Sequence, residues 1–231
     1  MSIFNQFKPE NYTNESKIWR YIDFSKFVDL LDSRSLFFSQ LNVLCKQDPY
    51  EGSYVPFASN KTDEDSKKIL KELDKIIQNG TFVSCWYLSE IESAALWKLF
   101  PKSDEGIAIK TTVNKLNNAI EHKNTEKIIL QGSVTYGHEK IIKSRKESFY
   151  SIEHAVFTKR AFFEHEKELR LVIHTYDLKT PVLYNGTGIK IEVDIASMIS
   201  EVIISPTAPS WFGDLVRRVV KHYGFSFEMR V

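Results

Sequence analysis

Hydrophobic residues recur along the chain at two spacings, and these predict where strands give way to helices. Residues 18–22 are a short β-prone run, and Asp23 has the position of an N-cap for a helix with an apolar face. In residues 63–79 the apolar positions again have helical spacing, and Gly80 ends the element. Residues 81–87 are β-branched and aromatic, which predicts a buried strand. Strand and helix therefore alternate from near the start of the chain.

The same patterns continue to the last residue without a regular β-α-β repeat. Ser89 and Glu92 have capping-box spacing, which predicts a helix over residues 91–100. Further predicted strands are 36–39, 105–111, 127–136, 188–193, 201–205 and 225–231, and further predicted helices are 113–122 and 211–223, the latter with Trp211 facing inward. Irregular mixing of this kind is typical of an α+β protein with mixed or mainly antiparallel sheets. We predict a single domain over residues 1–231, because no linker or repeat divides the chain, with about the first 15 residues as a loose arm.

Composition and charge are those of an ordinary globular protein. Of the 231 residues, 42% are hydrophobic and 26% are charged, and 31 basic against 30 acidic residues give a net charge of +1. This balance gives no argument for a protein that coats a polyanion. We expect a cytoplasmic protein without membrane contact, because no apolar run reaches spanning length and the N-terminus lacks an export signal. Two cysteines and six dispersed histidines predict neither a disulfide framework nor a metal site.

The acidic run in residues 162–173 carries the most informative chemistry. If the chain is extended from Glu166 onward, then Glu166, Glu168 and Arg170 project from one face of a strand. A helix from about residue 147 to His165 is expected before that strand; if it instead continues through Arg170, Glu166 and Arg170 become an i,i+4 surface pair. Even on a strand, the three charges are either the floor of a site or a structural ion-pair array. The sequence leaves these alternatives open.

Seven short motifs follow one another along most of the chain. They are Trp19-Arg20-Tyr21, Ser35-Leu36-Phe37-Phe38-Ser39, Asp48-Pro49-Tyr50-Glu51-Gly52, Phe82-Val83-Ser84-Cys85-Trp86, Ala95-Leu96-Trp97, Glu105-Gly106-Ile107-Ala108-Ile109 and Glu166-Lys167-Glu168-Leu169-Arg170. In this order they resemble the bacterial and phage family catalogued as domain of unknown function 2971. One departure is Gln47, where that family commonly has Asn before its Asp-Pro pair. The family has no agreed activity, so the resemblance implies an architecture and a setting but no reaction.

A more distant likeness concerns the chain order of Arg20, Ser84 and the pair Glu166 and Glu168. This order resembles that of the ADP-ribosyltransferases of the arginine-serine-glutamate class. The likeness implies an ADP-ribosyltransferase-like fold and an enzyme that consumes NAD as its substrate, without a metal. It also implies a macromolecular acceptor, protein or nucleic acid. The bacterial and phage setting of the family named above suggests a use as a toxin or in phage defence. A departure lies at Ser84, which is followed by Cys-Trp where that class typically has Thr-Ser.

The chemistry of NAD cleavage explains why these residue types would serve. Glu168 would stabilise the oxocarbenium-like centre that forms when the bond between ribose and nicotinamide breaks. Ser84 would position that glutamate or a ribose hydroxyl, and Glu166 would orient or deprotonate the acceptor. Three residues are expected to hold NAD, by gripping its pyrophosphate or by stacking on nicotinamide: Arg20, Tyr21 and Trp86.

Two other functions remain open at the level of sequence. If Asp48 and Glu51 reach the same cleft as Glu166 and Glu168, the four carboxylates predict a divalent cation and a metal-dependent nuclease. The other alternative is a binding module without catalysis. The pattern predicts no oligomeric state.

Overall fold

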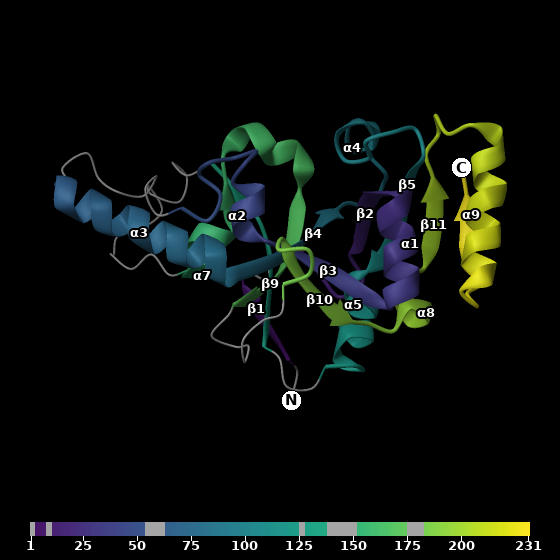
Figure 1. The fold of residues 1–231 in the computed structure, drawn as a ribbon, viewed down its shortest axis with the longest axis horizontal. Helices are drawn as coiled ribbons and strands as arrows, with labels where there is room; N and C mark the ends of the chain where they lie inside the picture. Colours follow the sequence, from purple (N-terminus) through teal and green to yellow (C-terminus); the bar gives the residue numbers. More distant parts are fainter. Residues whose placement is uncertain (1–2, 8–10, 54–62, 125–127, 138–151, 175–182) are drawn as a thin grey trace.

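A computed structural model describes residues 3–7, 11–53, 63–124, 128–137, 152–174 and 183–231. Within these residues, ten strands form one large sheet and two short strands form a second. In the large sheet, β1 with β6 and β11 with β12 are parallel pairs, and the other pairs are antiparallel. Helices pack around this sheet in Figure 1. The predicted α+β class with a mixed, mainly antiparallel sheet is confirmed.

The elements have the following bounds. The strands are β1 (Phe4–Phe7), β2 (Lys17–Asp23), β3 (Ser35–Gln40), β4 (Thr81–Leu88), β5 (Gly106–Thr112), β6 (Ile129–Ser133), β7 (Thr135–Tyr136), β8 (Thr158–Lys159), β9 (Glu168–His174), β10 (Gly188–Glu192), β11 (Glu201–Ile204) and β12 (Glu228–Arg230). The helices are α1 (Phe24–Ser33), α2 (Leu41–Leu44), α3 (Glu64–Gly80), α4 (Ala94–Leu99), α5 (Val113–Glu121), α7 (Ile152–Val156), α8 (Ile195–Met198) and α9 (Ser210–His222), with a 3-10 helix η3 at Ala161–Glu166.

Helix α1 packs on the sheet with the apolar face that its periodicity predicts, whereas three apolar residues of α3 are exposed, Ile69, Leu73 and Ile76. In α1, Phe27, Leu30 and Leu31 are buried in the main core beneath the sheet. At one end of the molecule α9 lies beside β11, and at the other α3 extends away from the body (Figure 1). Trp211, expected to face inward, is 54% exposed, because Phe212, one residue on, is the ring of α9 that enters the core.

One boundary prediction is wrong at its start. The helix expected over residues 91–100 is α4, which begins at Ala94, and Ser93 caps it by accepting a hydrogen bond from the backbone N–H of Leu96. The hydroxyl of Ser89 instead accepts from the N–H of Ile91 in the preceding turn. A side chain that can cap a helix can equally close a short turn, so the capping-box spacing was ambiguous.

The approach to the acidic run differs from the expected helix up to His165. Its part before Ile152 lies outside the described residues; beyond it, α7 ends at Val156, β8 follows, and η3 closes at Glu166. Lys167 then takes a left-handed conformation with φ 37°, and β9 begins at Glu168. The alternative of a helix through Arg170 is therefore wrong. The strand was expected to start at Glu166, but β9 starts two residues later, after the turn at Lys167. Strand alternation therefore orients Glu168 and Arg170 but not Glu166.

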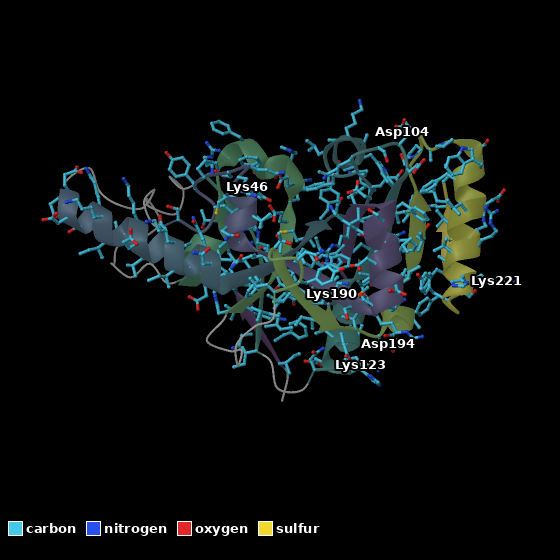
Figure 2. All side chains as sticks on the ribbon, in the orientation of Figure 1. Lys46, Asp104, Lys123, Lys190, Asp194 and Lys221 are labelled. Atoms are coloured by element: carbon cyan, nitrogen blue, oxygen red, sulfur yellow. The ribbon has the colours of Figure 1, made fainter. Side chains whose placement is uncertain are left out.

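The N-terminal segment contributes a strand to the sheet. Phe4–Phe7, inside the expected arm, pairs in parallel with β6 as β1. Among the described residues, no helix is long and apolar enough to cross a membrane. Figure 2 shows charged side chains distributed over the surface, with the labelled lysines and aspartates at separate places, which agrees with the balanced composition.

The large sheet forks at β4, and this fork positions the candidate site. At its C-terminal end β4 pairs with β2 through only two positions, Trp19 with Tyr87 and Ile18 with Leu88. At its N-terminal end the same edge of β4 pairs with β3, through Val83 and Phe82. Between these two pairings, β2 and β3 diverge beside the middle of β4. A sheet that separates in this way leaves a gap that side chains from both of its faces can enter.

Candidate functional site

A cavity of about 400 Å³ lies at the fork of the sheet. Its walls come from β2, β3 and β4, together with the start of β9 and the segments that contain Glu51 and Lys159. Of the predicted site residues, it is lined by Arg20, Tyr21, Trp86, Glu166 and Glu168, whereas Ser84 lies behind the wall and is fully buried. Pockets of this size are typical of small-molecule sites.

Strand alternation divides these residues between the two faces of the sheet. Glu168 pairs with Tyr87, which in turn pairs with Trp19, so these side chains share one face with Tyr21. Arg20 is one residue away from Trp19 and therefore projects from the opposite face, as Ser84 and Trp86 do. The fork is what allows residues from both faces to line one cavity.

At one end of the cavity, Arg20 bridges the separated strands. Its Nη1 donates to Ser84 Oγ at 2.7 Å, its Nη2 donates to the carbonyl oxygen of Phe37 at 3.0 Å, and its guanidinium lies 5.6 Å from the centroid of Trp86. These hydrogen bonds use two of the five N–H donors of arginine. Within the described part of the chain, no carboxylate lies at ion-pair distance from Arg20. Desolvation accordingly lowers the pKa of Arg20 to about 10.

Two aromatic residues, Trp86 and Tyr21, also line the cavity. Trp86 is buried, and its Nε1 donates to the same Ser84 oxygen at 3.2 Å, so Ser84 holds the arginine and the indole together. The hydroxyl of Tyr21 accepts from the backbone N–H of Ser93 at 2.8 Å, and burial raises the pKa of Tyr21 to about 12. Both rings are held in place by hydrogen bonds at their polar atoms.

The opposite end of the cavity is a cluster of buried charges. Arg170 Nε donates to Glu168 Oε2 at 2.8 Å, its Nη2 donates to Glu168 Oε1 at 3.1 Å, and the same Nη2 lies 2.5 Å from Glu51 Oε1. Lys159 Nζ lies 2.6 Å from Glu166, 3.0 Å from Glu168 and 3.6 Å from Glu51. Three carboxylates thus share two cations.

The two glutamates of the Glu-x-Glu pair differ in their protonation. Burial disfavours the charge of Glu168, but the charges of Arg170 and Lys159 outweigh this and hold the pKa of Glu168 well below its ordinary value. The pKa of Glu166 is raised to about 7, first by desolvation and then by the neighbouring charge of Glu168. Glu168 is therefore a permanent anion, while Glu166 can gain or lose a proton near neutral pH.

The turn at residues 48–52 reaches the same cluster through Glu51. Asp48 is buried with its Oδ1 2.8 Å from Arg160 Nε, and Glu51 is buried against Lys159 and Arg170. The carboxylates proposed for a nuclease therefore lie near one another, but lysine and arginine side chains separate them. Among the described residues, no group of three His, Cys, Asp or Glu has the geometry to hold a metal ion.

Sequence reasoning assigned Lys159 to a possible phosphate-facing basic surface and did not predict its pairing with the glutamates of the site. Lys159 is the second residue of the two-residue strand β8 and reaches three carboxylates. Its sequence neighbours Thr158 and Arg160 give no apolar period that would mark it as buried. A single basic residue seven positions before Glu166 is too common a spacing to be a signal by itself.

No family model matches this chain, and no curated protein matches it significantly. The resemblance to domain of unknown function 2971 thus stays a prediction. Among solved structures, Thermus sp. 2.9 DarT in complex with ADP-ribosylated ssDNA aligns with a TM-score of 0.44 at 8% identity, over 95% of each chain. The same protein in complex with NAD+ aligns with a TM-score of 0.42 at 9% identity, over 95% of this chain and 97% of the other. TM-scores and identities this low carry no argument about the chemistry of this protein.

Proposed function

We propose that this protein is an ADP-ribosyltransferase-like enzyme that cleaves NAD and transfers ADP-ribose to an acceptor. The observation that carries the proposal is the division of charge in one cavity. An arginine without a carboxylate partner forms one end, and a permanently ionised glutamate forms the other. NAD has the matching division, with an anionic pyrophosphate on one side of the scissile bond and a developing cation on the ribose.

The arginine end supplies the contacts for binding. A guanidinium with three N–H donors left over can donate to two phosphate oxygens at once. The pyrophosphate would provide the negative charge that Arg20 lacks inside the protein. Tyr21 and Trp86 line the same cavity, and we assign them the role of stacking on the nicotinamide.

The glutamate end supplies the chemistry. When the bond between C1 of the ribose and the nicotinamide nitrogen breaks, its electron pair leaves with nicotinamide and positive charge develops on the ribose. The fixed anion Glu168 stabilises that charge, and Arg170 and Lys159 keep it ionised and oriented. Glu166, with a pKa of about 7, then accepts the proton of the attacking acceptor group.

The charge cluster favours this reaction over a metal-dependent nuclease. A divalent cation needs carboxylate oxygens that converge on an empty position. Here Lys159 and Arg170 fill the positions between Glu51, Glu166 and Glu168. If the protein cleaves nucleic acid, if a chelator abolishes that cleavage, and if NAD is not turned over, the protein is a metal-dependent nuclease instead.

Incubation of the full chain with NAD labelled in the nicotinamide ring tests the proposal. We expect release of nicotinamide by the wild type, and a decrease of at least about 100-fold in Glu168→Gln, because transition-state charge stabilisation of this kind contributes that much. Glu192→Gln, at an exposed position of β10, is the matched control and should keep wild-type activity.

Glu168→Gln also breaks a buried ion pair, so its thermal unfolding is measured in parallel. If it is unfolded, Glu166→Gln, which leaves Arg170 paired with Glu168, serves as the second variant and should slow transfer while nicotinamide release persists. No nicotinamide release by the folded wild type, with or without candidate protein and nucleic-acid acceptors, would refute the proposal.

We extend the proposal to a bacterial cytoplasmic role as a toxin or in phage defence, on the basis of the family resemblance alone. The acceptor would be a protein or a nucleic acid. Expression of wild type and of Glu168→Gln in bacteria, with growth and phage infection as readouts, tests this role. Equal growth and equal phage sensitivity in the two strains would contradict it.

A further inference from the structure

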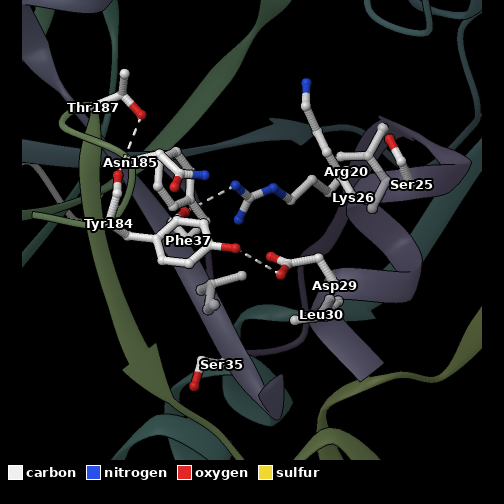
Figure 3. A pocket seen from close by; sticks show the side chains of 12 residues that line it. Arg20, Ser25, Lys26, Asp29, Leu30, Ser35, Phe37, Tyr184, Asn185 and Thr187 are labelled. Atoms are coloured by element: carbon white, nitrogen blue, oxygen red, sulfur yellow. Dashed lines mark hydrogen bonds between the residues drawn. The ribbon is translucent and has the colours of Figure 1, made fainter. Parts of the chain in front are cut away.

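A second cavity, of about 460 Å³, adjoins the fork on the far side of Arg20. Both cavities are lined by Arg20, Ile22, Lys26, Phe37 and Thr187, so these residues form a shared boundary. Figure 3 shows the second cavity with the guanidinium of Arg20 reaching toward Phe37 at its edge. Arg20 therefore lies between the glutamate end of the first cavity and the second cavity, to which the proposed function assigns no ligand.

The second cavity presents a preformed aromatic surface. The ring of Tyr184 is 40% exposed and lies 6.3 Å from the ring of Phe37, centroid to centroid, at 67°. This spacing is too close for a base to enter between the two rings. The ammonium of Lys190 lies 3.9 Å from the centroid of the Tyr184 ring and covers one of its faces, so a base can stack only on the opposite face. The remaining walls are aliphatic, from Ile22, Leu30 and Leu36.

A tight hairpin turn holds Tyr184 in position. Asn185 and Gly186 have φ values of 50° and 67°, and the N–H of Thr187 donates to the Tyr184 carbonyl at 3.1 Å. Two residues with positive φ are the requirement of a two-residue type I′ turn, for which Asn-Gly is the favoured sequence. Gly188 follows against β3, where a Cβ would lie 2.2 Å from the Phe38 carbonyl oxygen. The ring of Tyr184 is thus placed by the backbone before any ligand arrives.

Asp29 lines this cavity with a carboxylate that accepts hydrogen bonds. The Tyr184 hydroxyl donates to Asp29 Oδ1 at 3.2 Å, and Lys190 Nζ donates to the same oxygen at 2.6 Å (Figure 3 shows the tyrosine bond). Since both of these hydrogen bonds use Oδ1, Oδ2 has no partner among the described residues and can accept from a ligand. Carboxylate oxygens accept from the exocyclic amino group of adenine or from the hydroxyls of a ribose.

We propose that the second cavity binds the adenosine half of a dinucleotide, with the adenine stacked on Tyr184 and Asp29 accepting from the nucleoside. The inference rests on the proposed function, because Arg20 then holds the pyrophosphate at the shared boundary while nicotinamide lies in the first cavity. Lys26, which lines both cavities and is exposed, adds a second cation for the phosphates. The two cavities together offer a continuous path for one dinucleotide.

Calorimetric titration of the full chain with AMP tests the site without any turnover. We expect AMP to bind, Tyr184→Ala to weaken it by at least about tenfold, and Asp29→Asn to weaken it by a smaller factor, because base stacking on an aromatic ring is the larger contribution. Tyr184→Phe keeps the ring and should bind AMP within a few-fold of wild type. Trp211→Ala, an exposed aromatic residue on α9, is the matched control and should have no effect.

Nicotinamide mononucleotide, which lacks the adenosine half, separates this inference from the proposed function. Its binding and cleavage should be unchanged in Tyr184→Ala, while the KM for NAD rises. If AMP binding is lost in Trp86→Leu and kept in Tyr184→Ala, or if AMP does not bind the wild type at millimolar concentration, the inference is overturned whether or not NAD is cleaved. AMP binding that depends on Tyr184 in a protein that releases no nicotinamide would support the site and refute the enzyme.

Discussion

The two ends of the cavity at the fork differ in whether a buried charge has a charged partner. At the arginine end, the acceptors of Arg20 among the described residues are neutral, namely the Ser84 hydroxyl and the Phe37 carbonyl. At the glutamate end, Arg170 and Lys159 share three carboxylates, and every one of these groups has a charged partner. The same residue type, arginine, is uncompensated in one place and fully compensated in the other.

This difference separates charge that maintains the fold from charge that is available to a ligand. A buried ion pair contributes little net stability but is costly to break, because the partner left behind remains charged and desolvated. An arginine that already lacks a counter-ion leaves no charge stranded when it is removed. The charges of the acidic run therefore have a mixed role: Arg170 is structural, yet it also keeps Glu168 ionised.

The largest expected effect is on stability at the glutamate end. Arg170→Ala leaves Glu168 and Glu51 without their arginine, and we expect it to lower the free energy of unfolding by about 3–5 kcal/mol. Arg217→Ala, which breaks the exposed pair with Asp214, should cost about 1 kcal/mol or less. Denaturant unfolding followed by tryptophan fluorescence measures both. If the free energy of unfolding falls equally in the two variants, the ion pairs of Arg170 with Glu168 and Glu51 contribute no more to stability than an exposed pair does.

Arg20→Met is the counterpart at the arginine end. We expect its affinity for ADP to fall by about 10- to 100-fold, since hydrogen bonds between charged groups contribute about 1.5–3 kcal/mol. Its free energy of unfolding should change by less than half as much as that of Arg170→Ala. Arg218→Met, exposed on α9, serves as the control in titration calorimetry. A large loss of stability with unchanged ADP affinity would make Arg20 a structural bridge only.

A pH series distinguishes Glu166 from its paired neighbours. Because its pKa is raised to about 7, the folded protein keeps a proton that the unfolded chain loses near its ordinary pKa of 4.5. Stability therefore falls as the pH rises between these two values, by the linkage of proton binding to folding. The stability of wild type relative to Glu166→Gln should fall by about 3 kcal/mol from about pH 4.5 to about pH 8. A difference that stays constant with pH would place the pKa of Glu166 at its ordinary value.

The smallest effect is expected for Ser84→Ala. The hydroxyl accepts from both Arg20 and Trp86, so its removal should cost about 1 kcal/mol of stability and raise the KM for NAD a few-fold with kcat nearly unchanged. Steady-state kinetics and thermal unfolding measure the two quantities. A fall in kcat as large as that of Glu168→Gln would instead put Ser84 in contact with the reacting atoms.

Much of the architecture was predictable from short-range patterns. The helix with Phe27 and Leu31 on one face and the aromatic strand that contains Trp86 lie where their spacing placed them. The site was predictable only in part. Arg20 and Glu168 line one cavity, but no local pattern shows that they project from opposite faces of the sheet and meet through a fork. The pairing of Lys159 with Glu166 and Glu168 was not predicted, because a lysine seven or nine residues before a glutamate is too common to be a signal. The second cavity was not predicted, because the segments that line it are distant in sequence.

Most of the helices and strands, and the residues that could carry charge chemistry, were predictable from the sequence, because they depend on side-chain period and residue type. Which of these charges pair with residues of other elements depends on the fold. The left-handed residue Lys167 sets the first residue of β9, and alternation along that strand puts Arg170 beside Glu168. The pairing of β4 with β2 and β3 then leaves Arg20 at the fork, and only the fold brings Glu51 and Lys159 within reach of β9. Buried charge is decided by such long-range neighbours, since desolvation and Coulomb energy depend on distance in space and not along the chain.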